Sequence, residues 1–373
     1  MRENKKVLIF MGILIVALLS GCSNVGVASS WPGLSVSEDT GFFSYGTQVF
    51  AIDIKNGEEL WRFPREADAK EQFFAAPGIG EDRIVVGSYS NLLYSINKNS
   101  GAQQWIFDKA DDKYIASPLI VEEYVFAPNT DGFLYVLDGD GAISWKFKTK
   151  GPNWTTPVTD GSHVFLASMD HFLYAFNLAY SPNSLVASDN GETDLLEQPL
   201  WQIDLGAAVV SNPIIKDEII YVGTIDGKMF AINTANHEIV WVHTYDQSAA
   251  SIWGTPVILD GALMYGDEKG FLFAISLEDG TPLWSSPYEA GASLIASGVE
   301  IEENKAVFLT DDGKLFTINL DKEPQPILTL DTVMYASPIF SNGRIVLAPA
   351  AKDALFKAVD TEGRVIWNFN PSK

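Results

Sequence analysis

One short pattern returns along most of the chain, and this repetition constrains the fold more than any other feature. The stretch AIDIKNGEELW, residues 51–61, has close relatives in SINKNSGAQQW, AINTANHEIVW, AISLEDGTPLW and KAVDTEGRVIW. An apolar pair near the start of each copy gives an alignment whose leading residues are Val49, Leu93, Leu134, Leu173, Met229, Leu272, Leu315 and Leu355. The intervals are 44, 41, 39, 56, 43, 43 and 40 residues. A period near 42 with one insertion indicates a repeat architecture.

A second landmark keeps the same register. A proline lies 16 or 17 residues before each apolar pair except one, where Gly298 replaces it. These prolines are Pro32, Pro77, Pro118, Pro157, Pro213, Pro256 and Pro338. The two landmarks together define eight units.

Each unit has the pattern of a four-stranded antiparallel meander. Apolar and polar residues alternate, which is typical of strands. Pairs such as Asp131-Gly132 and Asp226-Gly227 suit the tight turn between the second and third strands, because both residue types accept positive φ. Asn56-Gly57 and Asp279-Gly280 suit the turn between the third and fourth. Eight such units predict an all-β fold, an eight-bladed β-propeller over residues 31–373.

A tryptophan recurs near the end of most units. It follows the apolar pair by eleven or twelve residues, and the insertion displaces it in unit four, while Ile327 takes its place in unit seven. A large aromatic side chain can fill the space between neighbouring blades. We expect a repeat core made of Trp61, Trp105, Trp145, Trp201, Trp241, Trp284 and Trp367.

The N-terminal residues have the features of an export signal. Arg2, Lys5 and Lys6 are followed by an apolar run over 7–19 and then by Leu19-Ser-Gly-Cys22. This ending resembles the lipobox of bacterial lipoproteins, in which the cysteine is acylated. The alternative is a plain signal peptide with an incidental cysteine. We predict a signal peptide over 1–21, lipidation at Cys22 and a tether over 22–30.

Charge and cysteine content limit the partners. Loss of residues 1–21 removes three basic residues and one acidic residue from a chain of net charge −23, and so leaves −25. Nucleic acid is therefore a poor partner, and membrane contact is expected through the lipid anchor only. Cys22 is the single cysteine, so the mature domain has no disulfide and no cysteine metal site.

The motif A-x-D-x-x-x-G-x-x-x-W in AIDIKNGEELW resembles the PQQ-like, quinoprotein-type propeller repeat, and the resemblance runs from about residue 31 to 372. Quinoprotein dehydrogenases with this repeat are much longer and hold a quinone with calcium and a cysteine pair. That pair is absent here. The chain is more similar to the non-enzymatic, BamB-like lipoproteins. This resemblance implies a monomeric propeller outside the cytoplasm, anchored to a bacterial membrane and bound to protein partners.

We found no strong candidate for catalysis or metal binding. The run Asp138-Gly-Asp-Gly141 could suggest a calcium loop, but it lies at an ordinary turn position and lacks further acidic ligands. The histidines, which are His163, His171, His237 and His243, show no metal-ligand spacing. We therefore expect no cofactor, no metal and no enzymatic activity.

Two features could carry binding. Aromatic residues stand just ahead of the landmark prolines, where the first strand of each blade would reach the channel mouth. They are Phe74, Tyr114, Trp154, Trp253 and Tyr335. They either pack as core between the blades or form a binding rim. The insertion over 179–199 joins the third and fourth strands of unit four, and it is either functional or merely mobile.

The sequence as a whole favours a non-catalytic scaffold for protein partners in the cell envelope, and the resemblance implies envelope or outer-membrane β-barrel assembly as its role. The alternative is a redox protein or ligand sensor that binds pyrroloquinoline quinone. The expected location is either the outer membrane of a two-membrane cell or the outer face of a single cell membrane.

Overall fold

The structure is a computed structural model, and it describes residues 32–178, 186–187, 193–194, 196–245, 249–301, 304–349, 351 and 354–372. The predicted signal peptide, Cys22, the tether and most of the insertion lie outside the described residues. No described segment is a helix, and none could span a membrane as an apolar helix.

The described chain forms eight four-stranded antiparallel sheets, each made of consecutive strands. The first four blades are β1 (Gly33–Ser37), β2 (Thr40–Tyr45), β3 (Gln48–Asp53), β4 (Glu59–Phe63); β5 (Gly78–Ile79), β6 (Arg83–Gly87), β7 (Leu93–Asn97), β8 (Gln103–Phe107); β9 (Leu119–Val121), β10 (Tyr124–Pro128), β11 (Phe133–Leu137), β12 (Ile143–Lys148); and β13 (Val158–Thr159), β14 (His163–Ala167), β15 (Phe172–Asn177), β18 (Trp201–Asp204). The short strands β16 (Val186–Ala187) and β17 (Thr193–Asp194) pair with each other inside the insertion.

The last four blades follow the same plan. They are β19 (Ile214–Lys216), β20 (Ile219–Gly223), β21 (Lys228–Asn233), β22 (Glu238–Thr244); β23 (Val257–Leu259), β24 (Ala262–Gly266), β25 (Phe271–Ser276), β26 (Tyr288–Glu289); β27 (Val299–Ile301), β28 (Lys305–Leu309), β29 (Lys314–Ile318), β30 (Gln325–Thr329); and β31 (Ile339–Ser341), β32 (Arg344–Leu347), β33 (Phe356–Val359), β34 (Val365–Phe369).

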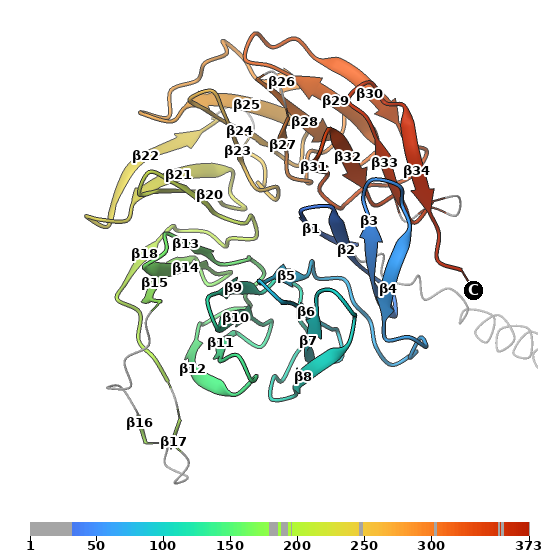
Figure 1. Cartoon of the computed structure of the whole chain (residues 1–373). Coiled ribbons are helices and arrows are strands. Elements are labelled where there is room, and N and C mark those ends of the chain that lie inside the picture. The colour runs from blue at the N-terminus through green and yellow to red at the C-terminus, as the bar shows by residue number, and fades with distance from the viewer. Residues whose placement is uncertain are drawn as a thin grey trace, which may run out of the picture. The chain divides into compact units, whose positions relative to one another are not determined.

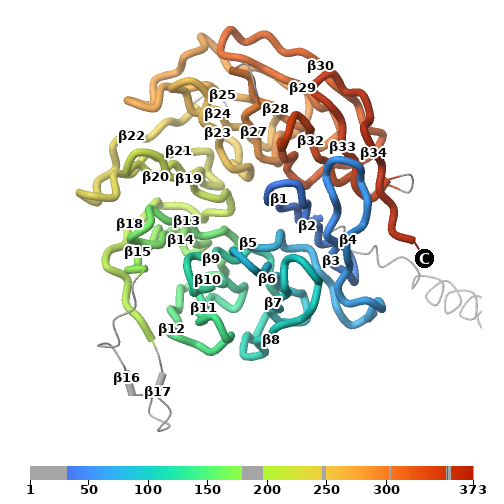
Figure 2. The backbone as a smooth tube through the Cα atoms, in the orientation of Figure 1, coloured from blue at the N-terminus to red at the C-terminus, as the bar shows by residue number. Residues whose placement is uncertain are grey.

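The blades form a ring with the first strand of each blade nearest the centre (Figure 1). First strands of neighbouring blades contact one another, and β31 of blade 8 contacts β1 of blade 1. Figure 2 shows these two end blades side by side. The predicted eight-bladed β-propeller is therefore confirmed.

The core consists of eight apolar layers, one between each pair of neighbouring blades. Phe126 and Trp145 of blade 3, for example, pack with Val164 and Phe176 of blade 4. Phe43 and Phe356 close the ring between blades 1 and 8, with ring centroids 4.3 Å apart. The leading residues of the repeat alignment are buried in these layers, as expected of third-strand positions.

A tryptophan joins most neighbouring blades in the same way. Its indole N–H donates to a backbone carbonyl in the turn between the third and fourth strands of the next blade. The pairs are Trp61 to Lys98, Trp105 to Gly139, Trp241 to Leu277, Trp284 to Leu320 and Trp367 to Ile54, at 2.7–3.0 Å. Trp61, Trp145, Trp241, Trp284 and Trp367 are buried, whereas Trp105 and Trp201 are half-buried.

The glycine of the repeat motif makes room for this tryptophan. A Cβ at Gly57, Gly101, Gly141 or Gly280 would lie 2.7–2.8 Å from the ring of the tryptophan in the preceding blade. Each of these glycines also has a positive φ. The Gly and Trp of one motif therefore serve two different blade interfaces.

Candidate functional site

The channel-mouth ring is the set of residues three positions before the landmarks of blades 2–8. It consists of Phe74, Ile115, Trp154, Val210, Trp253, Ile295 and Tyr335, all half-buried. These residues come from the connections that enter the first strand of blades 2–8. Because first strands lie nearest the centre, these connections lie at the inner end of the blades on one face, which we call the channel mouth.

Tyr114, predicted as a rim residue, is instead fully buried in the core between blades 2 and 3. It stands four residues before its proline and not three, in the register of Phe73, Ile252 and Met334, which are also buried. Ile115 takes the half-buried position in its blade. The prediction was therefore wrong by one residue at Tyr114, and it did not include the aliphatic ring members Ile115, Val210 and Ile295.

Hydrogen bonds between blades hold the ring in place. The residue just before each landmark is small and polar in most blades, and at Asn212, Ser297 and Ser337 its side chain binds the backbone of the blade before it. Thr156 N–H donates to Asn212 Oδ1 at 2.8 Å, Thr255 N–H to Ser297 Oγ at 2.8 Å, and Ser297 N–H to Ser337 Oγ at 2.9 Å. The backbone beneath the ring is thus hydrogen-bonded from blade to blade in this part of the propeller.

Further aromatic residues extend the mouth surface at blades 1 and 2. Phe74 contacts Tyr89 edge to face at 5.0 Å and Tyr45 at 6.3 Å. The turn that contains Tyr89 joins the second and third strands, and Tyr45 stands at the end of β2. These turns share a face with the ring, so the apolar surface continues outward from the channel.

Blade 4 departs from the other blades at this mouth. Where they place a buried apolar residue before the ring residue, blade 4 places Asn153, which is 0% exposed. Its Oδ1 lies 3.3 Å from Thr149 Oγ1, while Asn153 Nδ2 and the indole Nε1 of Trp154 have no hydrogen-bond partner among the described residues. A buried donor left unpaired costs about 1–3 kcal/mol.

The turns between second and third strands begin with a buried polar residue that caps the turn. Ser88 Oγ and Asn129 Oδ1, for example, accept backbone N–H groups two residues ahead. Asp267 fills this place in blade 6, is 2% exposed, and accepts from Lys269 N and Phe271 N at 2.9 Å each. Burial raises the pKa of the Asp267 carboxyl.

The Asp138–Gly141 run forms a turn between strands. Asp138 Oδ1 accepts the backbone N–H groups of Asp140 and Ala142, at 3.0 and 2.9 Å. Gly139 O accepts from the Trp105 indole, and Gly141 lies under that ring. The described residues contain no group of three or more His, Cys, Asp or Glu side chains arranged for a metal ion.

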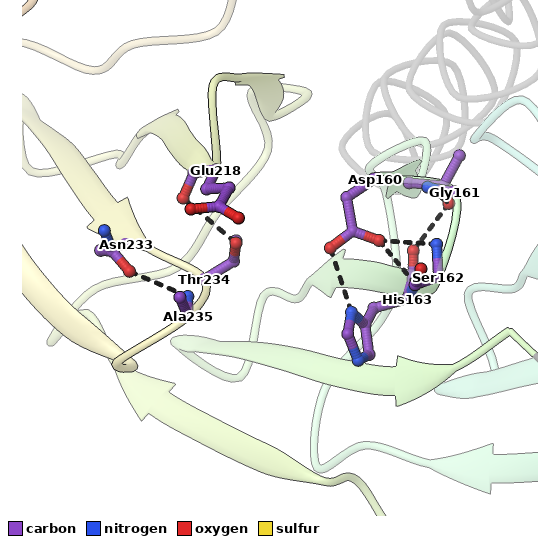
Figure 3. Close-up of polar contacts among 9 residues, drawn as sticks. Asp160, Gly161, Ser162, His163, Glu218, Asn233, Thr234 and Ala235 are labelled. Atoms are coloured by element: carbon purple, nitrogen blue, oxygen red, sulfur yellow. Dashed lines mark hydrogen bonds and ion pairs between the residues drawn. The ribbon is translucent and has the colours of Figure 1, made fainter.

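The histidines lie in two neighbouring blades, His163 and His171 in blade 4 and His237 and His243 in blade 5. His163 Nδ1 contacts Asp160 Oδ2 at 3.0 Å, and Asp160 Oδ1 accepts from the backbone N–H of Ser162 and of His163 (Figure 3). Figure 3 also shows the turn of blade 5 that leads to His237, in which Thr234 Oγ1 donates to Glu218 O at 3.1 Å. His237 stacks on Trp201 at 4.9 Å, and His243 Nδ1 contacts Tyr265 Oη at 2.6 Å.

The insertion leaves the propeller between β15 and β18, and its end lies against blade 3. Leu196 bridges Lys146 of β12, and Glu197 N–H donates to Lys146 O at 2.9 Å. The base of the insertion thus covers part of an edge strand. Connections between third and fourth strands lie on the face opposite the ring.

The fold and the contacts between tryptophan and glycine define the class: an eight-bladed β-propeller of PQQ-type repeats. A family model described as "Outer membrane protein assembly factor BamB" matches residues 23–139. The BamB of Yersinia pestis is 24% identical over 292 residues, which cover 62% of this chain and 70% of that protein. The BamB of Shewanella oneidensis is 23% identical over 211 residues, or 52% of each chain. The chain is therefore a BamB-like propeller of PQQ-type repeats.

Solved structures agree with the fold. BamB from Moraxella catarrhalis superposes with a TM-score of 0.67 at 16% identity and covers 89% of this chain and 94% of that one. The computationally designed Ika8 protein gives 0.65 at 14% identity, with coverage of 90% and 95%. Because a designed protein matches almost as well, these structural similarities support the fold and say nothing about the function.

Proposed function

We propose that this protein is a non-catalytic, protein-binding scaffold of the bacterial cell envelope that takes part in outer-membrane protein assembly. The observation that carries the proposal is the similarity of its sequence to outer membrane protein assembly factors from separate organisms. The proposed anchor is the lipid on Cys22, with the propeller held outside the cytoplasm.

The channel-mouth ring is the proposed docking surface. Protein interfaces are enriched in aromatic side chains at their centre, with a polar rim around them. Trp154, Trp253, Phe74 and Tyr335 provide such a centre, and the polar turns between second and third strands surround it. The bonds between blades keep the surface in one shape, so little conformational freedom is lost when a partner binds.

The proposal is tested by purifying the tagged, full-length protein from detergent-solubilised envelope after mild cross-linking and identifying its partners by mass spectrometry. We expect outer-membrane assembly proteins in stoichiometric amounts. As a control, the purified protein is incubated with pyrroloquinoline quinone and calcium. Tight quinone binding that supports dye-linked oxidation of an alcohol or sugar, with no protein partner recovered, would contradict the scaffold function.

A further inference from the structure

Blades 4 and 6 both place a tryptophan in the channel-mouth ring, but they differ in the residue before it. This difference points to a ligand. Blade 4 has Asn153-Trp154 where blade 6 has Ile252-Trp253 in the same register. Asn153 and Ile252 are both buried. Only blade 4 therefore places a buried amide beside its ring tryptophan.

These two side chains have hydrogen-bonding groups that the described residues leave unpaired. Trp154 Nε1 is inaccessible to solvent and has no acceptor, and Asn153 Nδ2 has none either. If the Asn153 amide is turned over, its nitrogen faces Thr149 Oγ1 and its oxygen becomes the unpaired group. In either orientation the site lacks one partner for Asn153 and an acceptor for Trp154.

We propose that Asn153 and Trp154 form the polar end of a peptide-binding site at the channel mouth, which holds an uncharged main-chain amide of an extended partner segment. Both groups are closed to solvent in the free protein, so the half-buried Trp154 side chain must turn when the segment binds. The inference rests on the proposed function, because the neighbouring ring residues would cover an apolar side chain of that segment. A peptide unit offers both an acceptor and a donor, so it satisfies either orientation of Asn153.

Charges of both signs surround the site. Asp131 and Asp170 stand in the turns of blades 3 and 4 on the same face, and Lys148 and Lys150 stand at the end of β12 and just after it. Asp170 Oδ2 accepts from the backbone N–H of Lys150, three residues before Asn153, at 2.8 Å. Because the charges are mixed, a neutral main-chain amide needs no counter-ion here.

The test begins with a phage-displayed library of random dodecapeptides, selected on the full-length mature protein in detergent. The best enriched peptides are resynthesised with acetylated and amidated ends, and their Kd is measured by calorimetry. We expect Trp154→Phe and Asn153→Ile each to weaken binding about tenfold. Trp253→Phe is the matched control, because it removes an indole N–H from the same register in blade 6, and its Kd should stay within twofold of the wild-type value.

A spectroscopic readout separates a hydrogen bond from a change in packing. In protein with ¹⁵N-labelled tryptophan, the indole resonance of Trp154, assigned from Trp154→Phe, should move downfield when the peptide binds. The Trp253 indole resonance should move less. Asn153→Ile should keep the melting temperature close to that of the wild type, because blade 6 already accommodates isoleucine in this register.

Two other outcomes overturn the inference. The peptide could bind Trp154→Phe and Asn153→Ile as tightly as wild type but fail to bind the double variant Trp154→Ser/Trp253→Ser. The mouth would then bind the peptide without any part played by the two polar groups. If the library yields no peptide, or only peptides that need a free carboxylate, the ligand class is wrong, and partner capture by the ring still tests the proposed function separately.

Discussion

The indole N–H of Trp367 donates to the carbonyl oxygen of Ile54 at 2.8 Å, and this bond joins the last blade to the first. No strand among the described residues crosses from one end of the chain to complete a blade at the other. Closure therefore depends on side chains, with the Trp367 ring against Gly57 and Arg62 donating to the carbonyl of Ser372 at 3.1 Å. The interface that closes the ring repeats the contact found at the other blades.

The first prediction concerns the tryptophan row. Trp241→Ala should lower the free energy of unfolding by about 3–5 kcal/mol, because it removes a large side chain from the layer between blades 5 and 6. Trp241→Leu should cost less, since Ile327 already occupies this place in blade 7. Val240→Ala is the control, because Val240 is 48% exposed next to Trp241. Urea unfolding that does not separate the three variants would mean that the row is not core.

The second prediction concerns the glycine beneath that tryptophan. Gly280→Ala should cost about 1 kcal/mol for its positive φ and about 1–3 kcal/mol more because its Cβ would press on the Trp241 ring. Gly261→Ala has the same kind of φ but open space around the Cβ, so it should show only the first cost. Equal melting temperatures for the two variants would rule out the contact.

The same pair can be checked by a double-mutant cycle. Trp241→Leu removes most of the ring that Gly280→Ala would strike. The two changes should therefore cost less together than the sum of their separate costs. Strict additivity would show that the glycine is needed for its backbone conformation alone.

The third prediction is a pH dependence of stability. Burial raises the pKa of Asp267 in the folded state above its ordinary value of about 4. The folded protein thus holds this proton more tightly than the unfolded chain, so this residue's contribution to stability falls as pH rises from that ordinary value through the raised pKa. Asp267→Asn keeps an oxygen for the turn and removes the charge. The melting temperature of Asp267→Asn minus that of wild type should therefore increase as pH rises through this range and stay at the larger value at neutral pH. A difference that is the same from pH 3 to pH 7 would contradict this.

The fourth prediction concerns the proposed anchor. Cys22→Ala should leave an unprocessed or soluble protein with the circular dichroism of an intact propeller, because Cys22 lies outside the propeller strands. Metabolic labelling with a fatty acid should mark wild type and not the variant. Equal membrane retention and equal processing of both proteins would remove lipidation from the account.

Much of this fold could be predicted from the sequence because each unit repeats the same local signals. The Asp-Gly turn pairs and the landmark prolines marked strand ends, and the period set the number of blades. The fourth strand of blade 6 shows where local signals were insufficient. Pro282 and Pro287 flank Trp284, and β26 begins only at Tyr288, because proline lacks the N–H that a strand ladder requires.

The candidate site was predicted less well, because its residues share a position relative to the landmarks and not a residue type. Aromatic character alone pointed to Tyr114, which is core, and not to Ile115 in the next position. Counting back three residues from each landmark of blades 2–8, Gly298 included, gives all seven ring residues. The special character of Asn153 depends on its burial and missing hydrogen-bond partners, which only the folded structure reveals.

The most direct test of the account is partner capture by Trp154→Ser/Trp253→Ser compared with a variant that lacks residues 179–199. The insertion joins β15 to β18, so it leaves the propeller on the face opposite the ring. Its removal should leave capture unchanged and should lower stability only by the loss of the Leu196 and Glu197 contacts with Lys146. The double serine variant should lose the partner, recovered from detergent-solubilised envelope and quantified by mass spectrometry, while its circular dichroism remains that of a folded β protein. Capture that is lost on deletion of the insertion and kept in the double serine variant would place the working surface on the opposite face and contradict the account.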